Sequence, residues 1–300
     1  MSGKGLLLLA VLALAGGCTM APKYAKPQAP VAAGWPTGPA YDGVQTSTGA
    51  PAAADLQWRE FFVDEKLRLA IEAALRNNRD LRLAALNVDL ARALYGIKRA
   101  ELWPAVDAVG SGLKQRVPGD LSSTGQARTS EQYGVNLGVA AWEIDFFGRV
   151  RSLKQSALEQ YLATEQGRRS AQILLVSSVA TAYLSLAAYQ ENLALAERTL
   201  ASQQAAYDLI KRRHALGLVT DVDLYRAQTP VDIARRDAAL LTQTVAQGRN
   251  ALDLLLGVPT PDALLPSDLD SVAPPTEISA GLSSAVLLRR PDVLRAEGLL

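Results

Sequence analysis

The sequence predicts a mainly α-helical protein in which long antiparallel helices form coiled coils and carry a two-stranded transmembrane β-hairpin. Three observations predict this fold class. Hydrophobic residues make up 49% and charged residues 20% of the chain, as in proteins that fold around a core. Apolar residues repeat every seven positions in two stretches between 179 and 255, which is typical of a coiled-coil seam. Residues 133–141 alternate between apolar and small or polar side chains, which is typical of a strand.

Composition excludes several functions. Basic and acidic residues number 31 and 30, so the net charge of +1 offers no electrostatic surface for nucleic acid, and no nucleic-acid partner is expected. A single cysteine and a single histidine leave any His/Cys metal site with two ligands at most. The sequence has no GxGxxG, P-loop, GxSxG or HExxH motif. We therefore expect no catalytic residue, no metal site and no enzyme activity.

Residues 1–17 have the organisation of a signal peptide. Lys4 is followed by an apolar run at 6–15 that is too short to span a bilayer, and by two glycines before Cys18. This arrangement resembles a bacterial lipobox, in which the cysteine thiol is acylated after cleavage. We expect a covalent lipid on Cys18 and no other cofactor, with Thr19 at the next position favouring the outer membrane. An ordinary secretory signal with a fortuitous cysteine is the alternative.

Residues 18–54 are expected to form an extended arm. Their prolines, set among glycine and alanine, are too dense for a helix; they are Pro22, Pro27, Pro30, Pro36, Pro39 and Pro51. The arm would tether the body to the lipid or lie along its surface.

The body, residues 55–300, opens with two helices at about 64–77 and 80–103. Apolar residues recur at helical spacing in the first, which Asn77 and Asn78 end. The second ends before Pro104, because a residue that precedes proline disfavours the helical conformation.

Two strands are expected at about 105–116 and 132–143, long enough to cross a membrane. The apolar face of the second strand would contact lipid and consists of Tyr133, Val135, Leu137, Val139 and Ala141. Aromatic residues that would lie at the membrane interface follow it, namely Trp142, Phe146 and Phe147. A soluble hairpin with one wet face is the alternative. Two strands cannot close a barrel, so a membrane hairpin needs strands from a repeat or from sister subunits.

A long helix at about 149–215, a tip at 216–220 and a helix at about 221–256 complete the first part of the body. Folding the chain at Gly217 brings the two seven-residue patterns into register, so the helices form an antiparallel hairpin. Gly217 suits the positive φ found after a helix, and Thr220 can cap the next helix.

Pro230 is expected to bend that last helix without ending it, because the apolar pattern continues past it. A linker at 257–276 follows. Residues 284–293 then repeat the pattern of residues 72–81, with Ala, Leu and Asp in register. We expect residues 277–300 to begin a second repeat, of which the chain holds only the opening.

Taken together, these stretches resemble the outer-membrane efflux protein family, the TolC-like channels, in its lipoprotein branch. The most specific match is the segment at 142–151, which is close to that branch's strand-to-helix signature. The other matches are residues 18–24 with Pro27, residues 78–81, Gly217 and Leu218 with Asp223, Arg226 and Ala227, and residues 289–292.

The resemblance implies a homotrimer whose subunits each give four strands to one barrel in the outer membrane, continued into the periplasm by a tube of helices. It implies a passive exit duct for small molecules, docked to a periplasmic adaptor protein and an inner-membrane efflux transporter. The residues expected to dock the adaptor are Leu216, Gly217, Leu218, Val219 and Thr220. Asp223 is a candidate for polar links that hold the tip closed, and its alternative role is a capping charge.

Two other classes of protein remain as alternatives. A periplasmic coiled-coil lipoprotein that acts as a scaffold without a pore fits the seven-residue patterns, although the alternating strand argues against it. An envelope hydrolase has only scattered Asp, Glu and Ser in its favour.

Overall fold

The computed structural model describes residues 22, 24–28, 38–39, 56–139, 142–278 and 284–300. The signal peptide predicted at 1–17, the lipidation site Cys18, most of the arm and the strand residue Ala141 lie outside the described residues. The chain divides into two compact units, the first comprising residues 1–27 and 89–162 and the second residues 28–88 and 163–300. Two helices, α4 (Arg79–Ala100) and α5 (Arg149–Ala215), contribute residues to both units.

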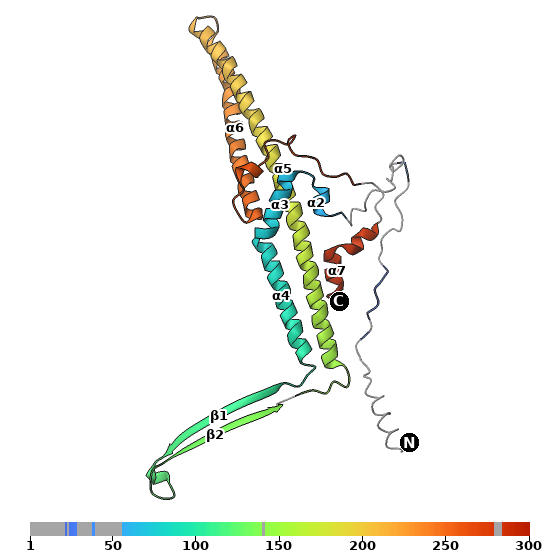
Figure 1. Ribbon diagram of the computed structural model, residues 1–300. Helices are drawn as coiled ribbons and strands as arrows, with labels where there is room; N and C mark the ends of the chain where they lie inside the picture. Colours follow the sequence, from blue (N-terminus) through green and yellow to red (C-terminus); the bar gives the residue numbers. More distant parts are fainter. Residues whose placement is uncertain (1–21, 23, 29–37, 40–55, 140–141, 279–283) are drawn as a thin grey trace. The chain divides into compact units, whose positions relative to one another are not determined.

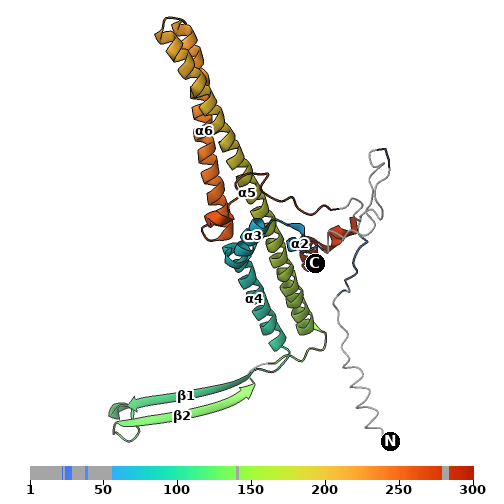
Figure 2. The same ribbon diagram turned by 45° about the horizontal axis from the view of Figure 1, so that its top comes forward.

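The second unit is a helical bundle. In addition to its parts of α4 and α5 it contains the α-helices α2 (Trp58–Phe61), α3 (Glu65–Asn77), α6 (Asp221–Leu256) and α7 (Pro291–Glu297). Helix α6 runs antiparallel beside the C-terminal half of α5, to which it is joined by residues 216–220 (Figures 1 and 2). These are the helices in which the sequence pattern predicts a coiled-coil hairpin, and α6 continues as a helix through Pro230.

The core of this unit lies where α3, α5 and α6 meet. Its largest fully buried side chains are Ile71 of α3, Val179, Tyr183 and Leu186 of α5, and Leu252 and Leu256 of α6. Burial, aided by the charge of Asp64, raises the pKa of Tyr183 to about 12. Among the described residues, α5 is the one helix long and apolar enough to cross a membrane by length and composition. Its large buried residues Val179, Tyr183 and Leu186 pack in this core.

A small residue faces large ones at one layer of the seam between α5 and α6. Gly248 of α6 lies against Leu186 and Tyr189 of α5, so that a Cβ added at Gly248 would lie 3.4 Å from Leu186 Cδ1 and 3.2 Å from Tyr189 Cδ2. The glycine therefore lets the two helices approach where α5 carries large side chains. This contact is one of the layers that the antiparallel register predicts.

Asn78 separates α3 from α4 and ties both to α6. Its side-chain oxygen accepts a hydrogen bond from the Leu81 N–H at 2.9 Å, which caps α4, and its amide nitrogen donates to the Leu255 carbonyl at 2.9 Å. Both bonds satisfy a side chain that is itself buried. Asn78, which is predicted to end the first helix, thus also connects α3 and α4 with α6.

The first unit contains the β-hairpin. Strands β1 (Val106–Val117) and β2 (Arg128–Val139) pair antiparallel along their whole length, from Val106 opposite Val139 to Val117 opposite Arg128 (Figure 1). The second strand is expected at 132–143, whereas β2 begins at Arg128, and Trp142 and Glu143 are not in a strand. Strand β2 begins earlier because β1 offers partners up to Val117. Residues 140–141, which follow Val139, lie outside the described residues.

Helix α4 also ends earlier than predicted, at Ala100 instead of 103. Its last turn is replaced by a tight turn in which Leu102 and Trp103 donate to the carbonyls of Arg99 and Ala100 at 3.3 and 3.0 Å. The conformational restriction that Pro104 places on the residue before it accounts for the difference.

After α6 the chain returns to the start of the body. Thr276 donates its backbone N–H to the Phe61 carbonyl at 2.8 Å and its hydroxyl to the Glu60 carbonyl at 2.7 Å. Helix α7 begins at Pro291, the position that corresponds to Arg79, the first residue of α4, in the repeat predicted from the sequence.

The C-terminal end of α6 yields a stability prediction. Gly257 has φ +73°, and a Cβ there would lie 2.5 Å from the Asn77 carbonyl oxygen, whereas Gly217 has φ +71° with nothing within 4 Å. Gly257→Ala combines left-handed strain with a clash and should cost about 3 kcal/mol of unfolding free energy. Gly217→Ala, the matched control, should cost about 1 kcal/mol. Thermal unfolding followed by circular dichroism compares them, and equal losses would contradict the close packing of α3 on α6.

Candidate functional site: membrane hairpin, junction and tip

One face of the hairpin is apolar along most of its length. Tyr133, Val135, Leu137 and Val139 of β2 lie on this face, and Val135 is 85% exposed. The β1 residues directly opposite are small or apolar, namely Gly112, Gly110, Ala108 and Val106. The ring of Tyr133 covers Gly112, where an added Cβ would lie 3.3 Å from Tyr133 Cδ1. The weak alternation of β1 in the sequence therefore reflects small residues placed beneath large ones of β2.

The opposite face of the hairpin is mostly polar. It carries Asp107, Ser111 and Gln115 of β1 and Gln132 and Asn136 of β2, together with the exposed apolar residues Val109 and Leu113 of β1. Because side chains on a strand alternate between its two faces, the hairpin has one face suited to lipid and one suited to water.

An ion pair ends the apolar face on the side of the hairpin nearest the loop between the strands. Beyond Gly112 and Tyr133 the next pair on this face is Lys114 and Glu131, which form an ion pair. Both faces of the hairpin are otherwise exposed, and within the described residues the two strands pair only with each other. An isolated two-stranded hairpin is marginally stable in water, so the pairing of β1 with β2 does not by itself account for its stability.

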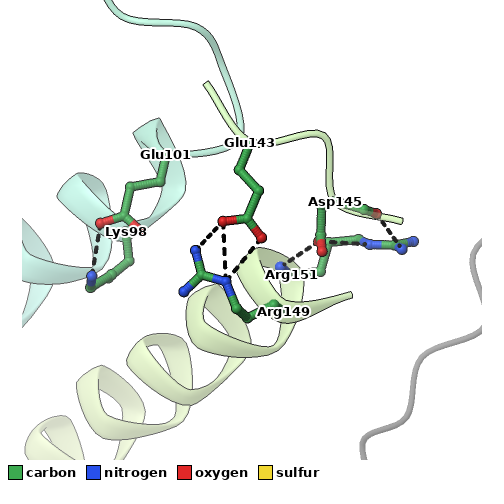
Figure 3. A network of polar contacts seen from close by, with 6 residues as sticks. All are labelled: Lys98, Glu101, Glu143, Asp145, Arg149 and Arg151. Atoms are coloured by element: carbon green, nitrogen blue, oxygen red, sulfur yellow. Dashed lines mark hydrogen bonds and ion pairs between the residues drawn. The ribbon is translucent and has the colours of Figure 1, made fainter. Parts of the chain in front are cut away.

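Two ion pairs, Glu143 with Arg149 and Asp145 with Arg151, lie at the junction between β2 and α5, and we call them the clamps (Figure 3). Arg149 donates from Nε to Glu143 Oε1 at 2.9 Å, and its Nη2 also bonds the carboxylate. Asp145 Oδ2 accepts from the backbone N–H of Arg151 at 2.9 Å and from its Nε at 3.2 Å. Between the clamps Gly148 has φ +79°, a left-handed conformation that glycine adopts without strain.

The clamps lower the pKa values of both carboxylic acids. The side-chain hydrogen bond from Arg149 lowers the pKa of Glu143. Desolvation alone would raise the pKa of Asp145, but the hydrogen bonds from Arg151 and the backbone outweigh it and the net shift is downward. Both groups are therefore ionised at neutral pH, and Asp145 places a negative charge at the N-terminus of α5, where the helix dipole favours it.

The predicted interfacial aromatics are all exposed at this junction, but the structure groups them differently. Trp142 and Trp103, the last residue before Pro104, both line one groove of about 660 Å³, with Ile97, Glu101, Arg149 and Val150 among its other walls. We call this the junction groove. Phe146 and Phe147 are exposed but are not among the residues that line it. Sequence reasoning missed Trp103, although its place beside the first strand was a usable signal.

Two caps fix the tip between α5 and α6. Gly217, with φ +71°, donates to the His214 carbonyl at 2.8 Å, and Leu218 donates to the Arg213 carbonyl at 3.0 Å, which is a Schellman motif. On the other side Thr220 and Asp223 form a reciprocal capping box. The tip is therefore a defined turn, and His214 Nε2 also lies 2.6 Å from Asp221 Oδ1.

The tip exposes more apolar surface than the sequence prediction includes. Of the five predicted docking residues, Leu216, Gly217, Leu218 and Thr220 are exposed and Val219 is half-buried. Val222 and Tyr225 in the first turns of α6 are also exposed. Their three-residue spacing within the expected helix was the signal that could have found them.

Asp223 is occupied in the capping box. Its carboxylate accepts from the Thr220 hydroxyl at 2.7 Å and from the Thr220 backbone N–H at 3.0 Å, and these bonds lower its pKa, the hydroxyl bond most. The capping role considered for this residue from sequence is thus present in the structure of the single chain.

Residues 70–258 match the protein family described as "Outer membrane efflux protein". The toluene efflux pump outer membrane protein TtgC of Pseudomonas putida is 48% identical over 99% of this chain and 61% of its own length. The antibiotic efflux pump outer membrane protein ArpC of Pseudomonas putida gives the same figures. The chain thus spans about 61% of the length of these curated relatives.

Solved structures resemble the fold as well. The open state of the MtrE outer membrane channel of Neisseria gonorrhoeae superposes with a TM-score of 0.74 at 34% identity, covering 94% of this chain and 61% of that one. That neighbour is an outer membrane channel by its title, and the mainly helical fold with one hairpin agrees with the fold class predicted from sequence.

The junction clamps yield a charge-reversal prediction. Arg149→Glu should bring two carboxylates together and speed chymotrypsin cleavage between residues 142 and 147 about two- to fivefold, the scale of an exposed ion pair. Adding Glu143→Arg restores opposite charges and should restore resistance to cleavage. Arg235→Glu, which breaks the ion pair with Asp232 on α6, is the control. If the double variant is cleaved as fast as Arg149→Glu, the clamp does not hold the junction.

The same clamps predict a response to acid. Because the pKa values of Glu143 and Asp145 are lowered on folding, their stabilisation is complete above the ordinary values of 4.5 and 3.8 and is lost as the pH falls through the lowered values. Fluorescence of Trp142, in a variant whose other tryptophans are replaced by phenylalanine, should stay constant from pH 7 to 5 and change at lower pH. Glu143→Gln should reduce the size of the change, and a transition near neutral pH would contradict this origin.

Proposed function

The chain belongs to the outer membrane efflux protein family, whose members lie in the outer membrane, and on this premise we propose that it is the channel component of a tripartite efflux pump. The channel acts as a passive exit duct for small molecules. The observation that carries the proposal is the fully exposed apolar face of the hairpin, attached to helices that pair along a coiled-coil seam. A duct needs no catalytic group, and we propose that the protein is not an enzyme.

The hairpin supports a shared barrel. Strands β1 and β2 leave their outer edges unpaired within the described residues, and an unpaired edge is costly in lipid. In a homotrimer each subunit would contribute this hairpin and a second one from the second repeat. The apolar face would then contact lipid and the polar face would line the lumen.

The tip supports docking to a partner. Leu216, Leu218, Val222 and Tyr225 form an exposed apolar surface on a turn that is fixed by caps at both ends. A preformed apolar surface loses little conformational entropy on binding. The proposed partner is a periplasmic adaptor protein that joins the channel to an inner-membrane transporter, with residues 216–220 at the centre of the contact.

Two further assignments belong to this proposal. Lipidation of Cys18 would anchor the arm in the outer membrane, since several acyl chains on one residue bind tightly at about 0.8 kcal/mol per buried methylene. Asp223 would exchange its bonds to Thr220 for contacts with neighbouring tips when the channel opens or closes. As for cargo, the names of the relatives refer to toluene and to antibiotics, and small organic molecules are the proposed class.

Conductance separates a duct from the scaffold lipoprotein without a pore. The full-length protein in planar bilayers should give uniform single-channel steps, and chemical cross-linking should yield trimers. The scaffold alternative predicts no steps at any protein concentration, and that result would end the duct proposal.

Substitution at the tip tests docking. Gly217→Glu places a charge on the apolar surface and should abolish efflux-dependent antibiotic resistance while trimer and membrane abundance stay normal. Gly125→Glu is the matched control, because Gly125 has φ +70° and open space around it but lies in the loop between the strands. Resistance that is retained in Gly217→Glu, or lost equally in Gly125→Glu, would remove the docking assignment.

A further inference from the structure

We propose that the junction groove binds the headgroup of a zwitterionic phospholipid, namely a phosphoethanolamine lipid of the periplasmic leaflet. The inference rests on the proposed function, because it requires the hairpin to lie in the outer membrane. Its basis is the combination of two tryptophans, an apolar floor and balanced charges in one groove of about 660 Å³, a volume within the range of small-molecule sites.

The groove lies at the level where a headgroup would lie. The apolar face of the hairpin starts at Val106 on β1 and ends at Val139 on β2, and these two residues are directly opposite each other. Trp103 precedes the first by three positions and Trp142 follows the second by three. Trp103 is 75% and Trp142 49% exposed. Tryptophan is favoured at the membrane interface because its ring is amphipathic, so the pair marks the periplasmic limit of the apolar face.

The charges around the groove balance. Glu101, Glu143 and Arg149 line it, and Lys98 bonds Glu101 Oε1 at 2.7 Å from the side of α4 (Figure 3). Two acids and two bases give no net charge, and the neighbouring Asp145–Arg151 pair adds none. An anionic headgroup would gain from the bases and lose to the acids. A zwitterion can satisfy both signs at once.

The two ends of a phosphoethanolamine group have partners at fixed places. Arg149 uses Nε and Nη2 on Glu143, which holds its guanidinium plane still and directs a charge-assisted donor to a phosphate. Lys98 contacts one oxygen of Glu101, so the carboxylate can accept from an ammonium through the other. The tryptophan rings add a cation–π surface for the ammonium, and the buried Val150 with Ile97 provides an apolar floor for the glycerol.

The test measures which lipid lies beside the two tryptophans. The variant Trp35→Phe/Trp58→Phe keeps only Trp103 and Trp142, since the chain has four tryptophans. It is reconstituted as the full chain in phosphatidylcholine vesicles. Quenching is compared for phosphatidylethanolamine and phosphatidylglycerol that carry the same nitroxide label on the acyl chain near the headgroup. The ethanolamine lipid should quench with an apparent affinity about threefold higher, the scale of one exposed ion pair.

Charge variants of opposite sign make the test specific. Glu101→Gln leaves the groove with a net positive charge and should shift preference about threefold toward phosphatidylglycerol. Lys98→Gln leaves it negative and should shift preference the other way. Asp232→Asn, which removes the acid of the i,i+3 pair with Arg235 on α6, is the control and should change nothing.

The outcomes separate this inference from the proposed function. Equal quenching by both lipids, or stronger quenching by phosphatidylglycerol in the parent, overturns the headgroup site and leaves the channel intact. Absence of quenching by either lipid while conductance persists also overturns it, because a neighbouring subunit then covers the groove. Absence of both quenching and conductance means that the hairpin does not enter the membrane, and the proposed function falls with it.

Discussion

Backbone groups that enter the hydrocarbon of a membrane must find hydrogen-bond partners in protein, and the hairpin formed by β1 and β2 provides them on only one side of each strand. The hairpin also has an exposed apolar face, and contact between apolar side chains and water is unfavourable. Within the described residues the hairpin therefore has neither a partner for its outer edges nor a cover for its apolar face.

The helical part is held together by helix ends whose backbone groups are hydrogen-bonded and by a small core. The Schellman motif at Gly217 and the capping box of Thr220 and Asp223 satisfy the ends of α5 and α6 where they meet. At the other end of α6, Gly257 lets that helix stop against α3. Between these points contacts such as Gly248 against Leu186 hold the helices in one register. A turn held in this way can present apolar side chains to a partner without collapsing onto them.

At the junction between β2 and α5, ion pairs hold the chain in place, as apolar packing does in the helical bundle. Where the strand pattern changes to the helical pattern, few side chains are buried, Val150 being one. The clamps of Glu143 with Arg149 and of Asp145 with Arg151 fix the direction of the chain there. Ion pairs suit this place because it lies at the limit of the apolar face, beside Trp103 and Trp142, where neither dry packing nor full solvation is available.

The sequence by itself determined the fold class, the antiparallel pairing of α5 and α6 about Gly217, and the apolar face of β2, because seven-residue and two-residue periods are local properties of the chain. Only the tertiary structure decided where β2 begins, why β1 carries glycines opposite Tyr133 and Val135, and that Trp103 lines the same groove as Trp142. It also decided that Val222 and Tyr225 extend the tip surface and that Asp223 is held by Thr220. Each of these depends on what lies across from a residue, which no period along the chain encodes.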